Sequence, residues 1–265
     1  MVLSSGGDGE AKVISRVVCR FSCGAASAVA TKLALHKYGC GRVEITYCDP
    51  GSEHSDNKRF LADCERWFGK SVIVLKSEKY ADTWAVWNDV RFITSAKGAP
   101  CTGMLKREPW TAMERPTDIL VLGYTAEEQD RADSLRKQNF ERTIETPLIE
   151  AGLTKADCLG MIERTGIVLP VMYQLGYHNN NCIGCPKGGM GYWNKIRKDF
   201  PETFERMAAL QRRLGPGASF LQDRADGKNE RISLDELQPD QGNHDAEPKI
   251  ECSIMCHLAE MEMSK

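Results

Sequence analysis

The first half of the chain alternates short apolar runs with amphipathic segments, and this alternation restricts the available folds more than any other feature. The strand-type runs are residues 13–21, 43–48, 71–75 and 118–123, and the helix-type segments are residues 28–38 and 55–68. Strands that alternate with helices favour a parallel sheet with right-handed crossovers. We therefore predict an α/β fold, in which helices cover both faces of a mostly parallel, twisted sheet.

Three loops of this predicted sheet are candidates for a binding site, because ligands bind beyond the carboxyl ends of parallel strands. They are residues 22–27, 49–54 and 123–131. The first has the sequence Ser22-Cys23-Gly24-Ala25-Ala26-Ser27 and leads into a helix. Small side chains let the backbone approach a phosphate, and a helix start supplies N–H groups and the positive end of a dipole. Such turns are common, so this loop alone is a weak indication of a phosphate site.

The character of the sequence changes after Thr146. A helix capped by Thr154 is predicted to run through Arg164, and residues 192–214 have the pattern of a charged amphipathic helix that Pro201 could bend. Residues 215–249 are polar and are expected to form a long loop or a partly ordered segment. The expected segments are 1–12, a disordered lead-in; 13–149, a nucleotide-binding core; 150–214, a helical and metal-binding part; and 215–265, a flexible linker and tail.

Composition limits the class of protein. The 265 residues fit one large domain, or one domain with a small appendage. The formal net charge of −2 gives no overall basic field for nucleic acid, although a local patch could still bind it. No run approaches 18 uncharged apolar residues and the first residues lack the apolar core of a signal peptide, so we expect no membrane association and a cytoplasmic location.

The chain has eleven cysteines, an odd number with uneven spacing, which favours metal or redox chemistry over a disulfide framework. Cys182 and Cys185 form a Cys-x-x-Cys pair among glycines that would let the backbone wrap around a metal. Cys101, Cys252 and Cys256 are further candidate ligands. Three or four thiolates suit zinc or a [4Fe–4S] cluster, whereas the alternative is a set of unrelated loop cysteines. Buried structural thiols are expected at Cys19, Cys40, Cys48, Cys64 and Cys158.

Taken together, these segments resemble the phosphoadenosine-phosphosulfate (PAPS) reductase family of the PP-loop, adenine nucleotide α-hydrolase-like superfamily. The resemblance covers most of residues 13–258. Residues 22–27 stand at the PP-loop position, Asp49-Pro50-Gly51 is similar to the Asp-Thr-Gly loop of the family, and the segment from Gly123 to Arg131 is similar to its Gly-Leu-Arg…Glu-x-x-x-Arg segment. The most specific match is Leu169-Pro170 followed by Met172-Tyr173-Gln174-Leu175-Gly176-Tyr177.

The resemblance implies an adenine nucleotide ligand and the residues that would hold it. The implied nucleotide-binding residues are Ser22, Cys23, Gly24, Ala25, Ala26, Ser27, Asp49, Gly51, Gly123 and Arg131. Cations near these loops that could bind phosphate or sulfate oxygens are Lys106, Arg107, Arg131, Arg136, Lys187, Lys195 and Arg197. The chain departs from the family at Ala26, where members that activate ATP carry an aspartate, and at Thr125, where the family has an arginine.

The resemblance also implies a cluster and a nucleophile. Cys182 and Cys185 fall where iron–sulfur members place a cysteine pair, and Cys101 lies in a region similar to their Cys-Cys-x-x-x-Lys-x-x-Pro segment. Cys256 is the implied fourth ligand of a [4Fe–4S] cluster, with zinc as the alternative. Cys252, in a segment similar to the Lys-x-Glu-Cys-Gly motif, is the implied catalytic nucleophile.

The resemblance therefore implies an enzyme that reduces adenylyl sulfate to sulfite through a tail cysteine. A thiol reductant such as thioredoxin is its expected partner. Two alternatives stay open. The first is ATP-dependent sulfur transfer to tRNA or DNA, with the basic side chains of residues 192–214 facing the nucleic acid. The second is a non-catalytic nucleotide-binding protein.

Overall fold

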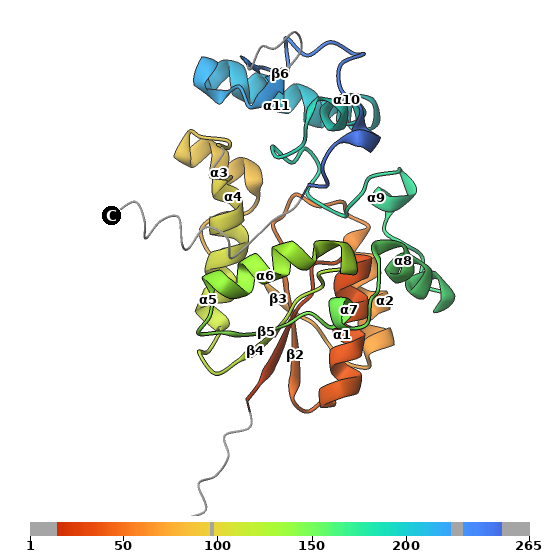
Figure 1. Ribbon diagram of the computed structural model, residues 1–265. Coiled ribbons are helices and arrows are strands. Elements are labelled where there is room, and N and C mark those ends of the chain that lie inside the picture. Colours follow the sequence, from red (N-terminus) through yellow and green to blue (C-terminus); the bar gives the residue numbers. More distant parts are fainter. Residues whose placement is uncertain (1–14, 96–97, 224–229, 251–265) are drawn as a thin grey trace, which may run out of the picture.

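The computed structural model describes residues 15–95, 98–223 and 230–250, and its centre is a five-stranded, all-parallel sheet (Figure 1). The strand order is β3-β2-β1-β4-β5. β1 (Val17–Arg20) lies in the middle, where Val17 pairs with Val43 of β2 (Val43–Cys48) and with Ile119 of β4 (Ile119–Val121). β3 (Ile73–Leu75) and β5 (Thr143–Glu145) form the edges. The predicted α/β class with a parallel sheet is confirmed.

The remaining elements connect and flank these strands. They are α1 (Ala25–Tyr38), α2 (Asn57–Phe68), α3 (Thr83–Val90), α4 (Pro100–Thr102), the π-helical turn η1 (Gly103–Arg107), α5 (Glu108–Met113), η2 (Ala126–Glu128), α6 (Gln129–Gln138), α7 (Pro147–Glu150), α8 (Lys155–Arg164), α9 (Val171–Gln174), α10 (Met190–Asp199), α11 (Pro201–Leu214), η3 (Pro216–Ala218), β6 (Leu221–Asp223), β7 (Glu230–Ile232) and η5 (His244–Ala246). No helix in the described ranges is long and apolar enough to cross a membrane.

Helices cover both faces of the sheet, as the alternation of side chains along β1 requires. Val17 and Cys19 pack into a core with α1, α2 and α8, whereas Val18 packs on the opposite face with Leu135 of α6. Successive side chains of a strand point to opposite faces, so a strand buried on both sides is apolar throughout. This double burial explains the uninterrupted valine-rich run at the start of the chain.

A second apolar core lies outside the sheet and joins segments that are distant in sequence. Trp87 of α3 and Leu105 of η1 pack with Trp193 of α10 and Met207 of α11. In Figure 1 these helices form the upper part of the molecule, above the sheet. The segment between β3 and β4 therefore packs partly with the second half of the chain, while α8 packs on α1 beside the sheet.

Residues 190–214 form two helices instead of one bent helix. α10 ends at Asp199, Phe200 adopts a non-helical backbone conformation, and Pro201 begins α11 at a position where its missing N–H costs no helical hydrogen bond. Pro201 thus starts a helix where the sequence pattern indicated a bend within one.

The described parts of the polar stretch that begins at residue 215 contain paired strands and buried leucines, which differs from a long loop and agrees with the alternative of a partly ordered segment. β6 and β7 pair in antiparallel fashion, and Leu221, Leu234 and Leu237 are buried in the second core. Residues 238–250, here called the strap, then run along α10. Side chains of α10 hold the start of the strap, because the Asn194 amide donates to the carbonyls of Gln238 and Gln241. Hydrogen bonds between residues this far apart in the sequence cannot be predicted from local composition.

Candidate functional site

A cavity of about 200 Å³ opens at the carboxyl ends of β1 and β4. Here the chain order reverses, because β2 lies on one side of β1 and β4 lies on the other. Parallel sheets bind ligands at such a point. The residues lining the cavity include six of the predicted binding residues, namely Ser22, Gly24, Ala26, Ser27, Gly123 and Arg131.

The loop of residues 22–27 is closed by its own hydroxyl groups. The Ser22 backbone N–H donates to Ser27 Oγ at 3.0 Å, and Ser27 Oγ donates to the Gly24 carbonyl at 3.0 Å. Gly24 is the N-cap residue of α1 and has no side chain to accept from the first helical N–H groups. The start of a helix of 14 residues therefore faces the cavity without a side-chain cap, which suits an anionic ligand.

Gly123 brings the end of β4 against this loop. A Cβ at this position would lie 2.6 Å from Ser27 Cα and 2.8 Å from Ser27 N. These are backbone atoms, so no side-chain rotation could relieve the contact. Glycine at position 123 is therefore required by the close approach of two cavity walls.

Four predicted binding residues do not line the cavity. Cys23 and Ala25 are fully buried beneath the loop, and the Cys23 thiol contacts the Asn57 carbonyl at 3.4 Å. Burial, with a further contribution from Glu53, raises the pKa of Cys23. Asp49 accepts from the Gly51 N–H at 2.9 Å and forms an ion pair with Lys76, so both residues shape the turn after β2.

Lys155 is a cavity residue that sequence reasoning missed. Its ammonium group donates to the Asn179 amide oxygen at 2.9 Å and to the Tyr173 hydroxyl at 3.3 Å. Both partners are neutral, so its positive charge is available to an anion in the cavity. The signal that could have found it is the Thr154 cap, since the first residue after a cap lies at the helix start, here beside the cavity.

Three of the predicted metal ligands come together in a second, smaller cavity. Cys101, Cys182 and Cys185 line a space of about 20 Å³ beside Trp87 and Lys106. The loop that carries the pair wraps around the Tyr192 hydroxyl, which accepts from the Gly184 and Cys185 N–H groups. Cys252 and Cys256 lie outside the described residues. Thiolates are ligands of zinc and of iron–sulfur clusters, so these cysteines are of the donor type that such a centre needs. Among the described residues, however, their sulfur atoms do not form a group within 4.8 Å of one another.

Lys106 lines both cavities and joins them. Its ammonium group lies 3.2 Å from a carboxylate oxygen of Glu53, which is buried. Glu53 also accepts from the Tyr47 hydroxyl and the Asn57 amide, each at 2.7 Å. Burial raises the pKa of Glu53, and Lys106 opposes this shift. Lys106 therefore lies between the two cavities, and the buried Glu53 carboxylate, itself held by further hydrogen bonds, positions its ammonium group.

The strap completes the first cavity with Lys249 and Ile250. Asn179 and Asn181 both donate to the Ile250 carbonyl, at 3.0 and 2.9 Å. Glu247 accepts from the N–H groups of Gly191 and Tyr192 at the start of α10. The described chain therefore reaches the cavity wall two residues before Cys252 in the sequence.

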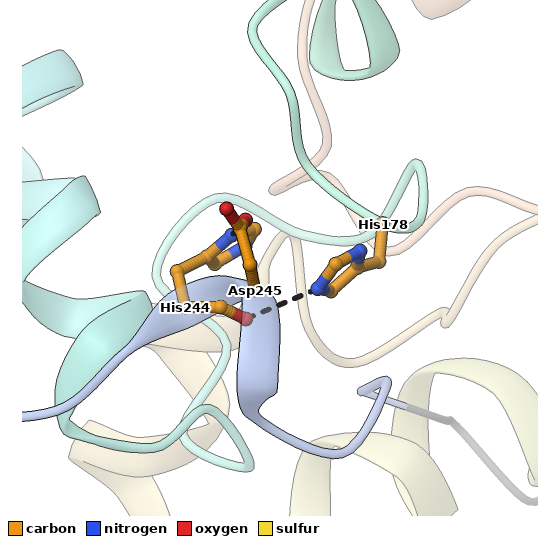
Figure 2. A group of neighbouring side chains, drawn as sticks. All are labelled: His178, His244 and Asp245. Atoms are coloured by element: carbon orange, nitrogen blue, oxygen red, sulfur yellow. Dashed lines mark hydrogen bonds and ion pairs between the residues drawn. The ribbon is translucent and has the colours of Figure 1, made fainter.

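A pair of stacked histidines joins the strap to the loop that contains His178 (Figure 2). The rings of His178 and His244 stack with centroids 4.6 Å apart, and His178 Nε2 bonds to the His244 carbonyl oxygen at 3.1 Å. Asp245 lies next to His244, and one donor atom of each of the three residues falls within 4.8 Å of the others. These donor types bind divalent metals. In this structure His178 Nε2 bonds to the strap backbone, and His244 Nδ1 lies 3.1 Å from a carboxylate oxygen of Asp245 within the strap.

The basic side chains of α10 and α11 are largely engaged within the molecule. Lys195 pairs with Asp199, and Arg212 pairs with Asp235. Arg197 donates to the Leu237 carbonyl. Arg206 lies over the Trp84 ring, and Arg213 bonds to Asn88. These contacts favour a structural role for this face over the alternative in which it contacts a nucleic-acid backbone.

Comparison with known proteins gives distant similarities. No protein-family profile matches the chain. An uncharacterized protein of Methanocaldococcus jannaschii is 23% identical over 206 residues, which cover 74% of this chain and 41% of that protein. This chain thus spans less than half the length of that relative. Among solved structures, the chain is similar to the phosphate complex of phosphoadenylyl-sulfate (PAPS) reductase from Candida auris, with a TM-score of 0.47 and 10% identity over 64% of this chain and 82% of that one.

Proposed function

We propose that this chain is an enzyme of sulfur metabolism that binds an adenine nucleotide in the cavity at the ends of β1 and β4. The nucleotide would be a sulfonucleotide, with its phosphate or sulfate against residues 22–27. The observation that carries this proposal is the juxtaposition of two cavities across Lys106, one with an uncapped helix start and the other with three cysteines.

The groups that line the first cavity support the binding of an adenylyl sulfate. The N–H groups at the start of α1 suit anionic oxygens, and Lys155 supplies a positive charge whose present partners are neutral. Leu122, Tyr124 and Leu135 add apolar surface on the side of β4 and α6, where a base could pack. Ala26 contributes no charge, so binding would depend on backbone donors and on these cations.

The second cavity would hold a [4Fe–4S] cluster, with zinc as the alternative metal. Cys101, Cys182 and Cys185 would be three ligands, and Cys256 is proposed as the fourth. A bound centre would supply a fixed charge next to the wall formed by Lys106. Lys106 itself would bind the sulfonate group of the adenylyl sulfate, at the side of the nucleotide cavity that faces the cysteines.

The proposed reaction uses Cys252 as the nucleophile. Its thiolate would attack the sulfur of the bound adenylyl sulfate, so that an S–S bond forms while the bond between sulfur and the bridging oxygen breaks. AMP would leave with that electron pair. A thiol reductant such as thioredoxin would then reduce the resulting S-sulfocysteine and release sulfite. Ile250 is held at the cavity by Asn179 and Asn181, which supports a role for the residues that follow it.

Anaerobic purification followed by nucleotide titration tests the proposal. The protein should contain iron and sulfide and should bind AMP or adenylyl sulfate in calorimetry. Gly24→Val should abolish binding and spare the fold, because a side chain there points at the Tyr173 hydroxyl, 3.0 Å from the Cβ position. Folded protein that is colourless and metal-free would contradict the proposed metal centre. Unchanged nucleotide affinity in Gly24→Val would contradict the proposed nucleotide site.

Two tail variants separate the roles of the tail cysteines. Cys252→Ser should bind nucleotide but form no covalent S-sulfocysteine, which mass spectrometry of the protein after incubation with adenylyl sulfate would detect. Cys256→Ser should lose the metal and its visible absorption. Full activity and intact metal in both variants would contradict the reductase. A requirement for ATP together with transfer of sulfur to nucleic acid would instead support the thiolation alternative.

A further inference from the structure

Asn180 has a buried oxygen atom that no group in the described residues bonds. The residue lines the first cavity and is 5% exposed, and its Oδ1 has no hydrogen-bond partner among the described residues. A buried acceptor left without a donor destabilises the folded protein. Atoms of this kind in a cavity wall mark a place where a ligand can donate a hydrogen bond.

The hydrogen-bond network fixes which end of the Asn180 amide is the oxygen. Glu53 is a carboxylate beside Lys106, so Asn57 must direct its NH₂ group to it, at 2.7 Å. The Asn57 oxygen then faces Asn180, whose NH₂ group donates to it at 2.8 Å and to the Cys23 carbonyl at 2.7 Å. Reversing the Asn180 amide would place its oxygen against two acceptors. The remaining Asn180 atom is therefore an acceptor, and it is buried without a partner among the described residues.

The position of Asn180 indicates which part of a nucleotide would meet this acceptor. Its NH₂ group bonds to the carbonyl of Cys23, which belongs to the loop proposed to bind the phosphate or sulfate. The ribose follows directly from the 5′-phosphate in an adenine nucleotide, whereas the amino group of adenine lies at the far end of the molecule. The donor nearest to Asn180 would accordingly be a ribose hydroxyl.

We propose that Asn180 is a specificity residue that accepts a hydrogen bond from a ribose hydroxyl of the bound nucleotide. This inference depends on the proposed nucleotide site. Because the same amide bonds to Cys23 and Asn57, it is held in place before the ligand arrives and needs little reordering to bind. A nucleotide without that hydroxyl would leave the acceptor buried and unsatisfied.

The test compares AMP with its 2′-deoxy and 3′-deoxy analogues in calorimetric titrations of the full chain. One of the two analogues should bind the wild-type protein about tenfold more weakly than AMP, or worse. In Asn180→Ala, AMP and that analogue should bind within about twofold of each other. Asn180→Ser serves the same comparison if the alanine variant does not fold.

Asn194→Ala is a matched control. Like Asn180, Asn194 donates two amide hydrogen bonds, here both to backbone carbonyls, and has a buried oxygen without a partner among the described residues, but it does not line this cavity. This variant should keep the wild-type preference for AMP. Equal binding of both analogues to the wild-type protein, or an unchanged preference in Asn180→Ala, would overturn the inference alone. Failure of every adenine nucleotide to bind the wild-type protein would overturn the proposed function and this inference with it.

Discussion

Cys23 occupies the second position of the proposed phosphate-binding loop, yet its thiol is a structural group. Its backbone lies in the left-handed region, with φ of 56°, a conformation that is costly for a residue with a side chain. The side chain fills the space between the loop and α2, where it contacts the Asn57 carbonyl. The left-handed backbone of Cys23 therefore shapes the loop, while its thiol packs in the core.

We expect Cys23 to resist alkylation in the folded protein. Burial raises its thiol pKa, so almost no thiolate forms at pH 8, and the group is also inaccessible. Cys40, which the sequence predicted to be buried, is exposed and should react with iodoacetamide under the same conditions. Peptide mass spectrometry after a timed reaction gives both rates. Labelling of Cys23 as fast as that of Cys40, without unfolding, would show that the loop opens.

Gly123→Ala should destabilise the protein and weaken nucleotide binding together. The added methyl group would meet the backbone of Ser27, so the end of β4 and the start of α1 would have to separate. Overpacking of this kind costs about 1–3 kcal/mol. Urea unfolding measures the loss of stability, and AMP titration measures the loss of affinity.

Gly41→Ala is the control for this substitution. No atom lies within 4 Å of the position its Cβ would take, and its φ is not in the left-handed region. Its free energy of unfolding should stay within about 0.5 kcal/mol of the wild-type value. Equal stability of the two variants would mean that the walls of the cavity can separate without cost.

At the scale of elements, the sequence predicted what local patterns determine. The strand at residues 43–48 and the helix that begins after Thr154 occur with the predicted bounds, because an apolar run and a capping box are local features. The edge strand β5 was missed, since its Thr-Ile-Glu sequence is short and half polar. No local pattern predicts a role for the asparagines at residues 179–181, because their bonds to Cys23 and Ile250 depend on tertiary contacts.

The strap shows the same limit of sequence reasoning. The backbone of the strap packs directly on α10, because a Cβ on Gly191 would lie 2.3 Å from the backbone nitrogen of His244. Glu247 then caps α10 from a distant part of the chain. Local composition describes these residues as a polar loop, and only the partner helix makes them an ordered element.

Glu247→Ala should release the strap from α10. The N–H groups of Gly191 and Tyr192 would lose their acceptor, at a cost of about 1 kcal/mol, and the strap would open more often. Limited proteolysis should then cut within residues 238–250 faster than in the wild-type protein. AMP affinity should fall as well, because Lys249 and Ile250 line the cavity.

Asp240→Ala provides the comparison for the strap, because Asp240 is an exposed carboxylate in the same segment. Its proteolysis rate should match that of the wild-type protein. If Glu247→Ala is cut no faster than Asp240→Ala, the cap on α10 does not control the strap.

At the scale of the whole molecule, the Lys106–Glu53 pair joins the sheet to the second core. Lys106→Met should destabilise the protein by about 3 kcal/mol at pH 8, because it leaves Glu53 buried without its cation. Removing the lysine also removes the influence that lowers the pKa of Glu53, so burial raises that pKa further. Adding Glu53→Gln to Lys106→Met should recover part of the loss.

The pH dependence of this variant follows from the direction of the shift. A carboxyl whose folded pKa exceeds its unfolded value of about 4.3 favours the folded state below that value and loses this contribution as the pH rises through the folded pKa. The deficit of Lys106→Met should therefore be smaller at pH 5 than at pH 8. The double variant should show no such change, and urea unfolding at the two pH values measures both. If Lys106→Met loses the same amount of stability at both pH values, Glu53 is not the group that the substitution leaves without a partner.

The order in which the cavity walls occur along the chain has a consequence for biosynthesis. A ribosome delivers all five strands of the sheet once Glu145 has emerged, but the wall formed by Lys249 and Ile250 emerges much later. A nascent chain can thus form its sheet while the binding site is still open on one side. The strap can therefore close this side of the cavity only after the whole sheet has been synthesised.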